Sequence, residues 1–491
     1  MTDTDSPGAL SPDPTDADLV DLSATELVRR TTAGEVTARQ LVEASLARIA
    51  ERDPALDAFS VVLADAARAE AAERDAARDR GEPCGPLHGV PVAVKEELDV
   101  AGCVTTFGGR GNSTPVRADG EVVRRLRAAG AVVVGKTRMP EFGQWPFTES
   151  EAGGLTRNPW DPGRTPGGSS GGTAVAVAAG MVPVAIGGDG GGSIRIPSAC
   201  CGLYGLKPQR GRVTTAPHPH LWWALGTVGP LTRTVADAAL VYDVLRGNEP
   251  GDLFTAPDPA RSFVEAAAST PRRLRIGWSE KPQTPFARVD PAHVRALEET
   301  AALLTDLGHD VRRFSPRWPD ATLAFVPQFF AGMRAEADEV EHPERLERRT
   351  RQAYRLGGWV RPGVVRWAVR AGERLAERAD RLFDQDGFDV LLTPTIAERP
   401  RAVGALDGVG PLRAAWRAQP MIAHCALWNV TGHPAAAVPA GTGRDGLPLS
   451  VQLVGRRHDE DVLLGLSAQL EAARPWAAPD PSRWAGAAGR G

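Results

Sequence analysis

Two clusters of glycine and serine, at residues 167–172 and 190–193, constrain this chain more than any other part of its sequence. The stretch between them is almost purely apolar, and no charged side chain occurs from Thr165 to Gly188. Glycine lacks a Cβ atom, so backbone amides in such loops can approach a ligand closely. A serine there can present its hydroxyl beside several amides. This arrangement is typical of a nucleophile next to an oxyanion hole.

Lysine is the second informative residue type. The chain has 57 lysines and arginines, but its lysines are confined to positions 95, 136, 207 and 281. Lys95 ends the apolar, β-branched run 90–94, which we expect to be a buried strand. Burial removes water from an amine and favours its neutral form, which can act as a base. We interpret Lys136 and Lys207 as structural.

Composition and charge exclude several classes of partner. With 42% hydrophobic and 24% charged residues, the 491-residue chain has a globular composition. Its net charge of −4 gives no electrostatic footprint for nucleic acid or for an anionic membrane. The acidic N-terminus lacks the apolar segment of a signal peptide. The apolar run 173–186 is too short to cross a membrane, so we expect it to form a buried helix and then a strand. The five irregularly spaced cysteines predict reduced thiols in the cytoplasm and no zinc site.

Helical and strand patterns alternate up to about residue 245. This alternation predicts an α/β protein with a mixed, mostly parallel sheet. Capping boxes fit residues 23–26 and 37–40, so we expect helices to begin there. Further helices are expected at residues 65–80, 121–129, 343–356 and 364–383. Further strands are expected at residues 131–134, 389–394, 429–439 and 449–454.

The chain shows no repeat and no linker, so we expect one large domain over residues 20–475. Residues 250–420 are rich in arginine-bearing helical segments and form a helical elaboration of that domain. Residues 1–19 are rich in Asp, Pro, Thr and Ser and are expected to be a disordered tail. Residues 476–491 are expected to be a loose tail.

Two familiar motifs match the sequence without their structural context. Residues 130–137 match the Walker A pattern, but the expected order is helix, glycine, strand, whereas a phosphate loop follows a strand and opens a helix. Residues 167–171 and 168–172 match the G-x-S-x-G motif of α/β-hydrolases, but a turn-rich loop precedes them instead of a strand. We therefore favour neither a nucleotide site nor a Ser-His-Asp triad.

Five motifs follow one another along the chain: GPLHGVPVAVK at 85–95, GGSSGG at 167–172, GGGSIRIP at 190–197, CGLYGLKP at 201–208 and GLPLSVQLV at 446–454. In this order they resemble the amidase signature family, most nearly its stand-alone actinobacterial amidases. The resemblance spans about residues 20–475, with a signature core at about 85–215. It implies a single large domain in which the sheet is sandwiched between helices.

The resemblance also implies a Ser–Ser–Lys triad that works without a metal or a cofactor. Ser193 corresponds to the nucleophile and Lys95 to the base. Ser169 corresponds to the bridging serine, which the family usually holds on a cis peptide bond. The implied oxyanion hole consists of the backbone amides of Gly190, Gly191, Gly192 and Ser193.

The chain departs from the family pattern beside the triad. Lys95 is followed by Glu96 and Glu97, where the family usually has Asp and then Asn or Asp. Gln209 stands where Thr is common. Aromatic residues near the motifs are candidates for an acyl pocket; they are Phe142, Trp145, Phe147, Trp222 and Trp223.

We expect a cytoplasmic amidase, monomeric or homodimeric, that acts on a small-molecule amide. It would form a seryl acyl-enzyme and release a carboxylate plus ammonia or an amine. Aryl amides, esters and carbamates are open as substrates. One alternative is the amidase subunit of a tRNA-dependent amidotransferase. The other is a catalytically inactive binding protein on the same fold.

Overall fold

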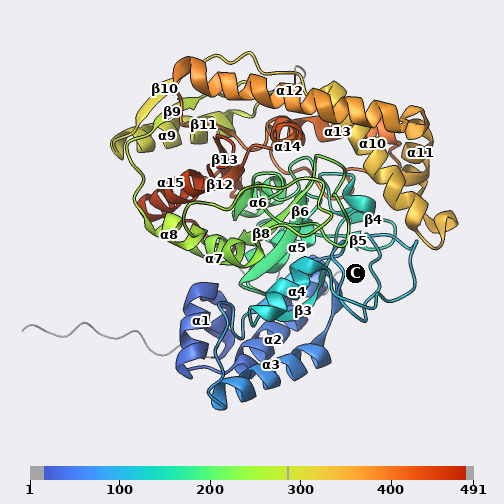
Figure 1. The fold of residues 1–491 in the computed structure, drawn as a ribbon, viewed down its shortest axis with the longest axis vertical. Coiled ribbons are helices and arrows are strands. Elements are labelled where there is room, and N and C mark those ends of the chain that lie inside the picture. The colour runs from blue at the N-terminus through green and yellow to red at the C-terminus, as the bar shows by residue number, and fades with distance from the viewer. Residues whose placement is uncertain (1–15, 285–286, 481, 483–491) are drawn as a thin grey trace, which may run out of the picture.

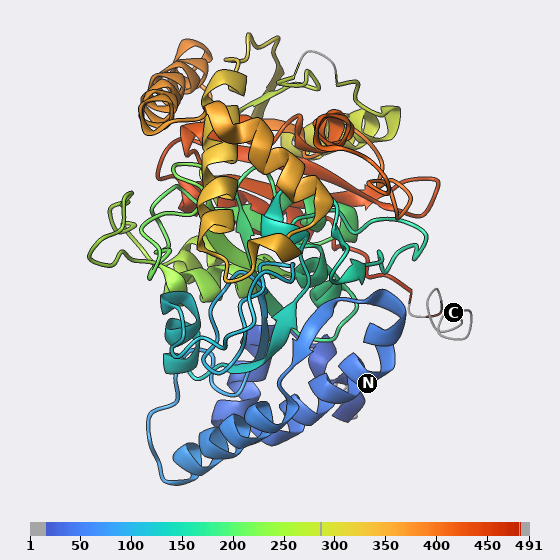
Figure 2. The ribbon, with the colours of Figure 1, turned by 90° about the vertical axis from the view of Figure 1, so that its right-hand side faces the viewer.

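The computed structural model describes residues 16–284, 287–480 and 482. In this part of the chain, eleven strands form one sheet, and helices pack on both of its faces (Figures 1 and 2). The strands are β1 Phe59–Val62, β2 Pro91–Lys95, β3 Val132–Thr137, β6 Val184–Asp189, β7 Tyr204–Lys207, β8 Thr227–Thr232, β9 Arg275–Trp278, β10 Asp310–Arg313, β11 Val390–Pro394, β12 Ala435–Thr442 and β13 Pro448–Gly455.

The strand order is β1-β3-β2-β6-β8-β7-β12-β13-β11-β9-β10. Parallel neighbours form two groups, β3-β2-β6 and β11-β9-β10, and antiparallel pairs join these groups and add β1 at one edge. A separate hairpin pairs β4 Glu149–Ser150 with β5 Gly154–Leu155. The expected α/β domain, with a large mixed sheet between helices, is confirmed.

The helices are distributed along the whole chain, with short 3₁₀ turns at Asp16–Asp21, Glu141–Gly143, Pro343–Arg345 and Gly357–Trp359. They are α1 Ala24–Ala33, α2 Ala38–Leu56, α3 Ala64–Asp79, α4 Glu121–Ala128, α5 Gly171–Ala178, α6 Arg195–Cys201, α7 Val235–Leu245, α8 Phe263–Ala268, α9 Pro291–Asp306, α10 Thr322–Glu339, α11 Arg348–Leu356, α12 Pro362–Asp386, α13 Pro411–Ile422, α14 Ala426–Thr431 and α15 Glu460–Ala473.

Successive side chains of a strand point to opposite faces of the sheet, and here they enter two different hydrophobic layers. On β2, Val92 and Val94 pack in the layer that includes α1, α4 and α7, whereas Ala93 packs in the layer with α2, α3 and α5. The same alternation places the Lys95 side chain on the Ala93 face, toward α5. The fold thus delivers a lysine from a buried strand end.

The predicted helical elaboration forms α10, α11, α12 and α13. These helices lie together beside the sheet, and α12 crosses the top of the molecule in Figure 1. Within the described residues, none of the helices combines the length and hydropathy that a membrane span needs.

Local signals in the sequence were mostly reliable. The capping box at 37–40 is complete, because Thr37 accepts from the Gln40 amide and the Gln40 side chain accepts from the Thr37 amide. Ser23 caps α1 in the same way, but the Glu26 carboxylate pairs with arginines and does not return to the cap. The strand expected at 429–439 is wrong in its first half, because residues 426–431 form α14 and β12 begins only at Ala435.

The predicted tails need one correction. Residues 1–15, 481 and 483–491 lie outside the described part of the chain. The start of the domain was placed too late, because Asp16–Asp21 is a 3₁₀ turn in which Leu19 and Val20 are buried. At the other end, Trp476 stacks on Tyr204 with a ring-centroid distance of 6.1 Å.

Candidate active site

Lys95 is buried at the end of β2, with 1% of its surface exposed. Its Nζ donates a hydrogen bond of 2.9 Å to Ser169 Oγ. The same nitrogen lies 3.0 Å from Glu97 Oε2, and both partners of this ion pair are largely buried. The lysine is therefore dry, as the sequence predicted, but it also has a carboxylate partner that the sequence analysis did not assign.

Ser169 lies in the glycine-rich loop before α5, and the Gly168–Ser169 peptide bond is cis, as the resemblance implied. The loop passes very close to a neighbouring segment of backbone. A Cβ on Gly168 would lie 2.7 Å from the Phe147 nitrogen and 2.9 Å from the Trp145 oxygen. Glycine at position 168 therefore lets Ser169 reach the lysine without a clash.

The second glycine loop carries Ser193 between β6 and α6. One backbone hydrogen bond joins the two loops, from the Ser170 amide to the Ser193 carbonyl at 3.3 Å. Ser193 Oγ makes no hydrogen bond within the described part of the chain, and Ser193 lines the same cavity as Lys95 and Ser169. The three predicted triad residues therefore meet at one cavity, although they come from three separate segments.

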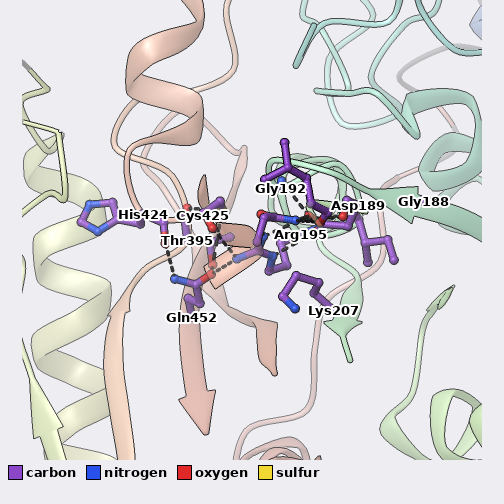
Figure 3. Close-up of polar contacts among 12 residues, drawn as sticks. Gly188, Asp189, Gly192, Arg195, Lys207, Thr395, His424, Cys425 and Gln452 are labelled. Carbon is purple, nitrogen blue, oxygen red and sulfur yellow. Dashed lines mark hydrogen bonds and ion pairs between the residues drawn. The ribbon is translucent and has the colours of Figure 1, made fainter. Parts of the chain in front are cut away.

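A buried ion pair supports the Ser193 loop (Figure 3). Asp189 and Arg195 have fully buried side chains and are 3.0 Å apart. Arg195 also donates to Gln452 Oε1 at 2.8 Å and to the Cys425 carbonyl at 3.2 Å. Burial opposes the charged form of Asp189, but the adjacent guanidinium outweighs it and lowers the pKa of the carboxyl. Asp189 and Arg195 thus hold the loop through fully buried charged groups, although Asp189 is also among the residues that line the cavity.

One predicted donor of the oxyanion hole, the Gly192 amide, is bound to Asp189 instead. The Gly192 amide donates to Asp189 Oδ1 at 2.7 Å, so it is turned away from the cavity. Gly192 is absent from the described cavity lining, which includes Gly190, Gly191 and Ser193. Three of the four predicted amide donors therefore remain available.

The cavity has a volume of about 350 Å³, and its walls are mainly apolar. Of the five aromatic candidates, Phe142, Trp145 and Trp222 line it. The other two were wrong. Phe147 is fully buried in the core beside α5, and Trp223 stacks on His220 outside the described lining.

Half of the aromatic residues that line the cavity come from α10, and the sequence did not indicate them. Phe325, Phe329 and Phe330 line the cavity, although they lie far from the glycine motifs in the sequence. Phe329 contacts Trp222 edge-to-face at 5.3 Å and Trp145 at 6.4 Å between ring centroids. No spacing rule could have linked α10 to the motifs, because the contact depends on how the helical elaboration packs.

A second carboxyl group lies close to the lysine. Glu336 on α10 accepts a hydrogen bond of 2.7 Å from Trp222 Nε1. Burial raises the pKa of Glu336 well above its usual range, the neighbouring Glu97 raises it further, and the Trp222 hydrogen bond opposes the rise. Burial thus favours the uncharged form of the Glu336 carboxyl.

Lys136 and Lys207 have other partners, as their structural interpretation requires. Lys136 Nζ donates to Thr105 Oγ1 at 3.1 Å, and Lys207 Nζ donates to the Pro208 carbonyl at 2.7 Å. Burial lowers the pKa of both amines. Neither lysine contributes to the described cavity lining.

Comparison with known proteins places this geometry among hydrolases of amide bonds. The family model described as Amidase matches residues 40–464. AmiB2 of Mycobacterium tuberculosis, a proposed amidase, is 49% identical over 400 residues, which cover 81% of this chain and 84% of that protein. The 6-aminohexanoate-cyclic-dimer hydrolase of Paenarthrobacter ureafaciens is 36% identical over 431 residues, covering 81% and 85%. A solved bacterial aryl acylamidase of the amidase signature family has a TM-score of 0.83 and 29% identity, covering 96% of this chain and 99% of that one.

Proposed function

This chain belongs to the amidase family and hydrolyses amide bonds, and from that premise we propose that it does so with Ser193, Ser169 and Lys95. The observation that carries the proposal is the 2.9 Å hydrogen bond from Lys95 Nζ to Ser169 Oγ, in a cavity that Ser193 also lines. A hydroxyl is a weak nucleophile unless a base removes its proton as it attacks. In this proposal Ser169 relays that proton from the Ser193 hydroxyl to the amine, with which Ser169 already shares a hydrogen bond.

The proposed reaction has two halves. In the first, Ser193 Oγ attacks the amide carbonyl carbon while its proton passes to Ser169 Oγ and the Ser169 proton passes to neutral Lys95 Nζ. The intermediate then expels the amine, which takes the proton back through the relay, and leaves a seryl ester. In the second half, water loses a proton to the same relay as it attacks the ester carbonyl carbon. The bond to Ser193 Oγ then breaks, the relay returns its proton to that oxygen, and the freed acid ionises in solvent.

Backbone amides of the second glycine loop stabilise the negative oxygen of each intermediate. The donors in this proposal are the amides of Gly190, Gly191 and Ser193, because the Gly192 amide is bound to Asp189. Loss of one oxyanion-hole donor in other enzymes costs about 10²–10³ in kcat. The Asp189–Arg195 pair contributes by holding these amides in place.

The walls of the cavity favour an amide with a bulky apolar or aromatic acyl group. Trp145, Trp222 and Phe329 supply flat apolar surfaces near the triad. A pocket of this kind binds mainly by burial of apolar area. Aryl amides, esters and carbamates remain within the proposal, and the relatives lend no support to an amidotransferase subunit or an inactive binding protein.

We also propose a cytoplasmic monomer or homodimer. The five cysteines carry free thiols, four of them buried, which suits a reducing compartment. Sedimentation of the purified chain would give its mass, and fractionation of the producing cells would give its location.

The triad is tested with a fluorophosphonate probe and with p-nitroacetanilide as the substrate. Ser193→Ala should abolish labelling and turnover, and Lys95→Ala and Ser169→Ala should lower both by several orders of magnitude. Ser198→Ala is the matched control, because Ser198 is equally buried near the loop and its hydroxyl has no partner among the described residues. Wild-type turnover by Lys95→Ala, with the fold intact, would remove the lysine from the mechanism.

A further inference from the structure

Two consecutive acids follow the proposed base, and the structure separates them. A turn closed by the hydrogen bond from the Leu98 amide to the Lys95 carbonyl, 2.9 Å long, brings Glu97 back beside the lysine. Glu96 turns the other way, accepts from Thr106 Oγ1 at 2.7 Å and lies in the field of Lys136. One of the two carboxyl groups therefore faces the triad and the other does not.

Glu97 is built into the active site. Its Oε2 lies 3.0 Å from Lys95 Nζ, and its side chain is 11% exposed. Its Oε1 is buried and has no hydrogen-bond partner among the described residues. This oxygen occupies the place of a side chain on Gly188, since a Cβ there would lie 2.2 Å from it. Glycine at position 188 thus leaves room for the carboxylate.

No other charged group competes for the lysine within its described surroundings. On α10, Glu336 is the second nearby acid; it accepts from Trp222 Nε1 at 2.7 Å, and burial raises its pKa and so favours its uncharged form. On β6, Asp189 is committed to Arg195. On β3, Lys136 bonds to Thr105, and α5 has no titratable side chain. The charge that acts on the amine is therefore that of Glu97.

We propose that Glu97 is a positioning residue that fixes both the charge and the direction of the Lys95 amine, and thereby sets the pH below which the enzyme is inactive. This inference rests on the proposed role of Lys95 as the base. A carboxylate at ion-pair distance stabilises the ammonium form, which has no lone pair and cannot accept the Ser169 proton. The enzyme becomes active only when the ammonium releases a proton to solvent at higher pH.

The carboxylate also orients the neutral amine. An ionised carboxylate can only accept hydrogen bonds, so the amine must direct one N–H toward Glu97. With one N–H directed at Glu97, the lone pair of the neutral amine can make the 2.9 Å contact with Ser169 Oγ and accept from its hydroxyl. Glu97 therefore restricts activity at low pH and aligns the base at high pH.

The test is the pH dependence of fluorophosphonate labelling of Ser193, measured from about pH 5 to 10 on the full chain. Glu97→Gln removes the charge and keeps an acceptor of the same shape. An opposite charge at this range shifts a titration by about 1–3 pH units. The acid limb of the Glu97→Gln profile should therefore move to lower pH by about 1 unit or more, with labelling on the limb at least about tenfold faster than wild type. A merely damaging substitution cannot produce this gain.

Two further variants separate charge from direction. Glu97→Ala should move the acid limb in the same sense and also lower the plateau at high pH, because the amine loses its acceptor. Gly188→Ala places a methyl group where Glu97 Oε1 now lies and should displace the carboxylate from Lys95. The acid limb should then move to lower pH, which keeps the test available if Glu97→Gln does not fold. Glu96→Gln is the matched control and should leave the limb in place.

The outcomes distinguish this inference from the proposed mechanism. An acid limb that is unchanged or moves to higher pH in Glu97→Gln, while Lys95→Ala is inactive, overturns the role of Glu97 and leaves the triad standing. Wild-type labelling of Lys95→Ala overturns the mechanism and the inference together. Circular dichroism at each pH restricts the comparison to folded protein.

Discussion

The buried pair of Asp189 and Arg195 offers the sharpest test of how the Ser193 loop is held. Asp189→Asn keeps the shape of the side chain but removes its charge. It also replaces one acceptor oxygen by an NH₂ group that must face the donors now bound to Asp189. These donors include the amides of Gly192 and Ile194, at 2.7 and 3.2 Å. The change therefore acts on the loop and on the ion pair together.

The expected loss of stability follows from burial. Both side chains are fully buried, so Asp189→Asn leaves the Arg195 charge without its counterion in a dry interior. Breaking a buried pair in this way costs about 3–5 kcal/mol. The loop amides also lose their common anchor, and a displacement of about 1 Å near reacting atoms can cost about 100-fold in rate. We expect both effects in the same variant.

The assay combines urea unfolding with fluorophosphonate labelling. Glu460→Gln is the control, because Glu460 and Arg212 form an equally buried pair, 2.8 Å apart, outside the described lining of the cavity. This control should lose a similar free energy of unfolding and keep its labelling rate. Asp189→Asn should lose both stability and about 100-fold in labelling under conditions where the protein is folded.

Either of two results would refute this reasoning. A loss of less than about 1 kcal/mol in Asp189→Asn would mean that the pair is not as dry as its burial indicates. A wild-type labelling rate in the folded variant would mean that the Ser193 loop holds its shape without Asp189. Equal losses of labelling in Asp189→Asn and Glu460→Gln would point to general destabilisation.

Three more predictions concern other parts of the molecule. Gly192→Ala should abolish labelling, because its φ of 122° suits glycine and the added Cβ would lie under 3 Å from two side chains; wild-type labelling would contradict this. Burial, and then the neighbouring Glu141, raise the pKa of Glu347 to about 7. Between about pH 4.5 and 7 the folded state therefore binds more protons than the unfolded state, and the free energy of unfolding should fall as pH rises. Glu347→Gln should flatten that slope in urea titrations, and an unchanged slope would count against it. Phe329→Ala should raise KM for aryl amides more than it lowers kcat, because Phe329 packs against Trp222 in the cavity wall and is not part of the proton relay. An equal fall in kcat would indicate that Phe329 acts on the reacting groups.

The sequence was sufficient to predict those structural elements that depend on the local order of residues along the chain. The run before Lys95 is apolar and β-branched, and it forms a buried strand that ends at the lysine. The apolar stretch between the glycine loops forms a buried helix and then a strand, as expected. Such features follow from hydrophobic pattern and from glycine, which act over a few residues.

The sequence was insufficient where long-range contacts decide the outcome. Val430 and Thr431 favour a strand by their side chains, yet they lie in α14, where the neighbouring Asn429 donates 2.8 Å hydrogen bonds to Asp189. The Gly192 amide is likewise turned from the cavity by Asp189. The Glu97 contact depends on a turn whose direction two consecutive glutamates do not reveal.

Part of the cavity wall comes from a stretch of the chain that lies apart from the groups that react, although Phe142 and Trp145 lie in the same stretch as those groups. The triad and its glycine loops lie between residues 95 and 193, whereas α10, α11 and α13 begin after residue 320 and contribute residues to the lining of the same cavity. Recombination within the later stretch could therefore change what the protein recognises while its reactive groups are inherited intact. Chimaeras that exchange residues 322–422 between relatives offer a direct route to catalysts with new selectivity.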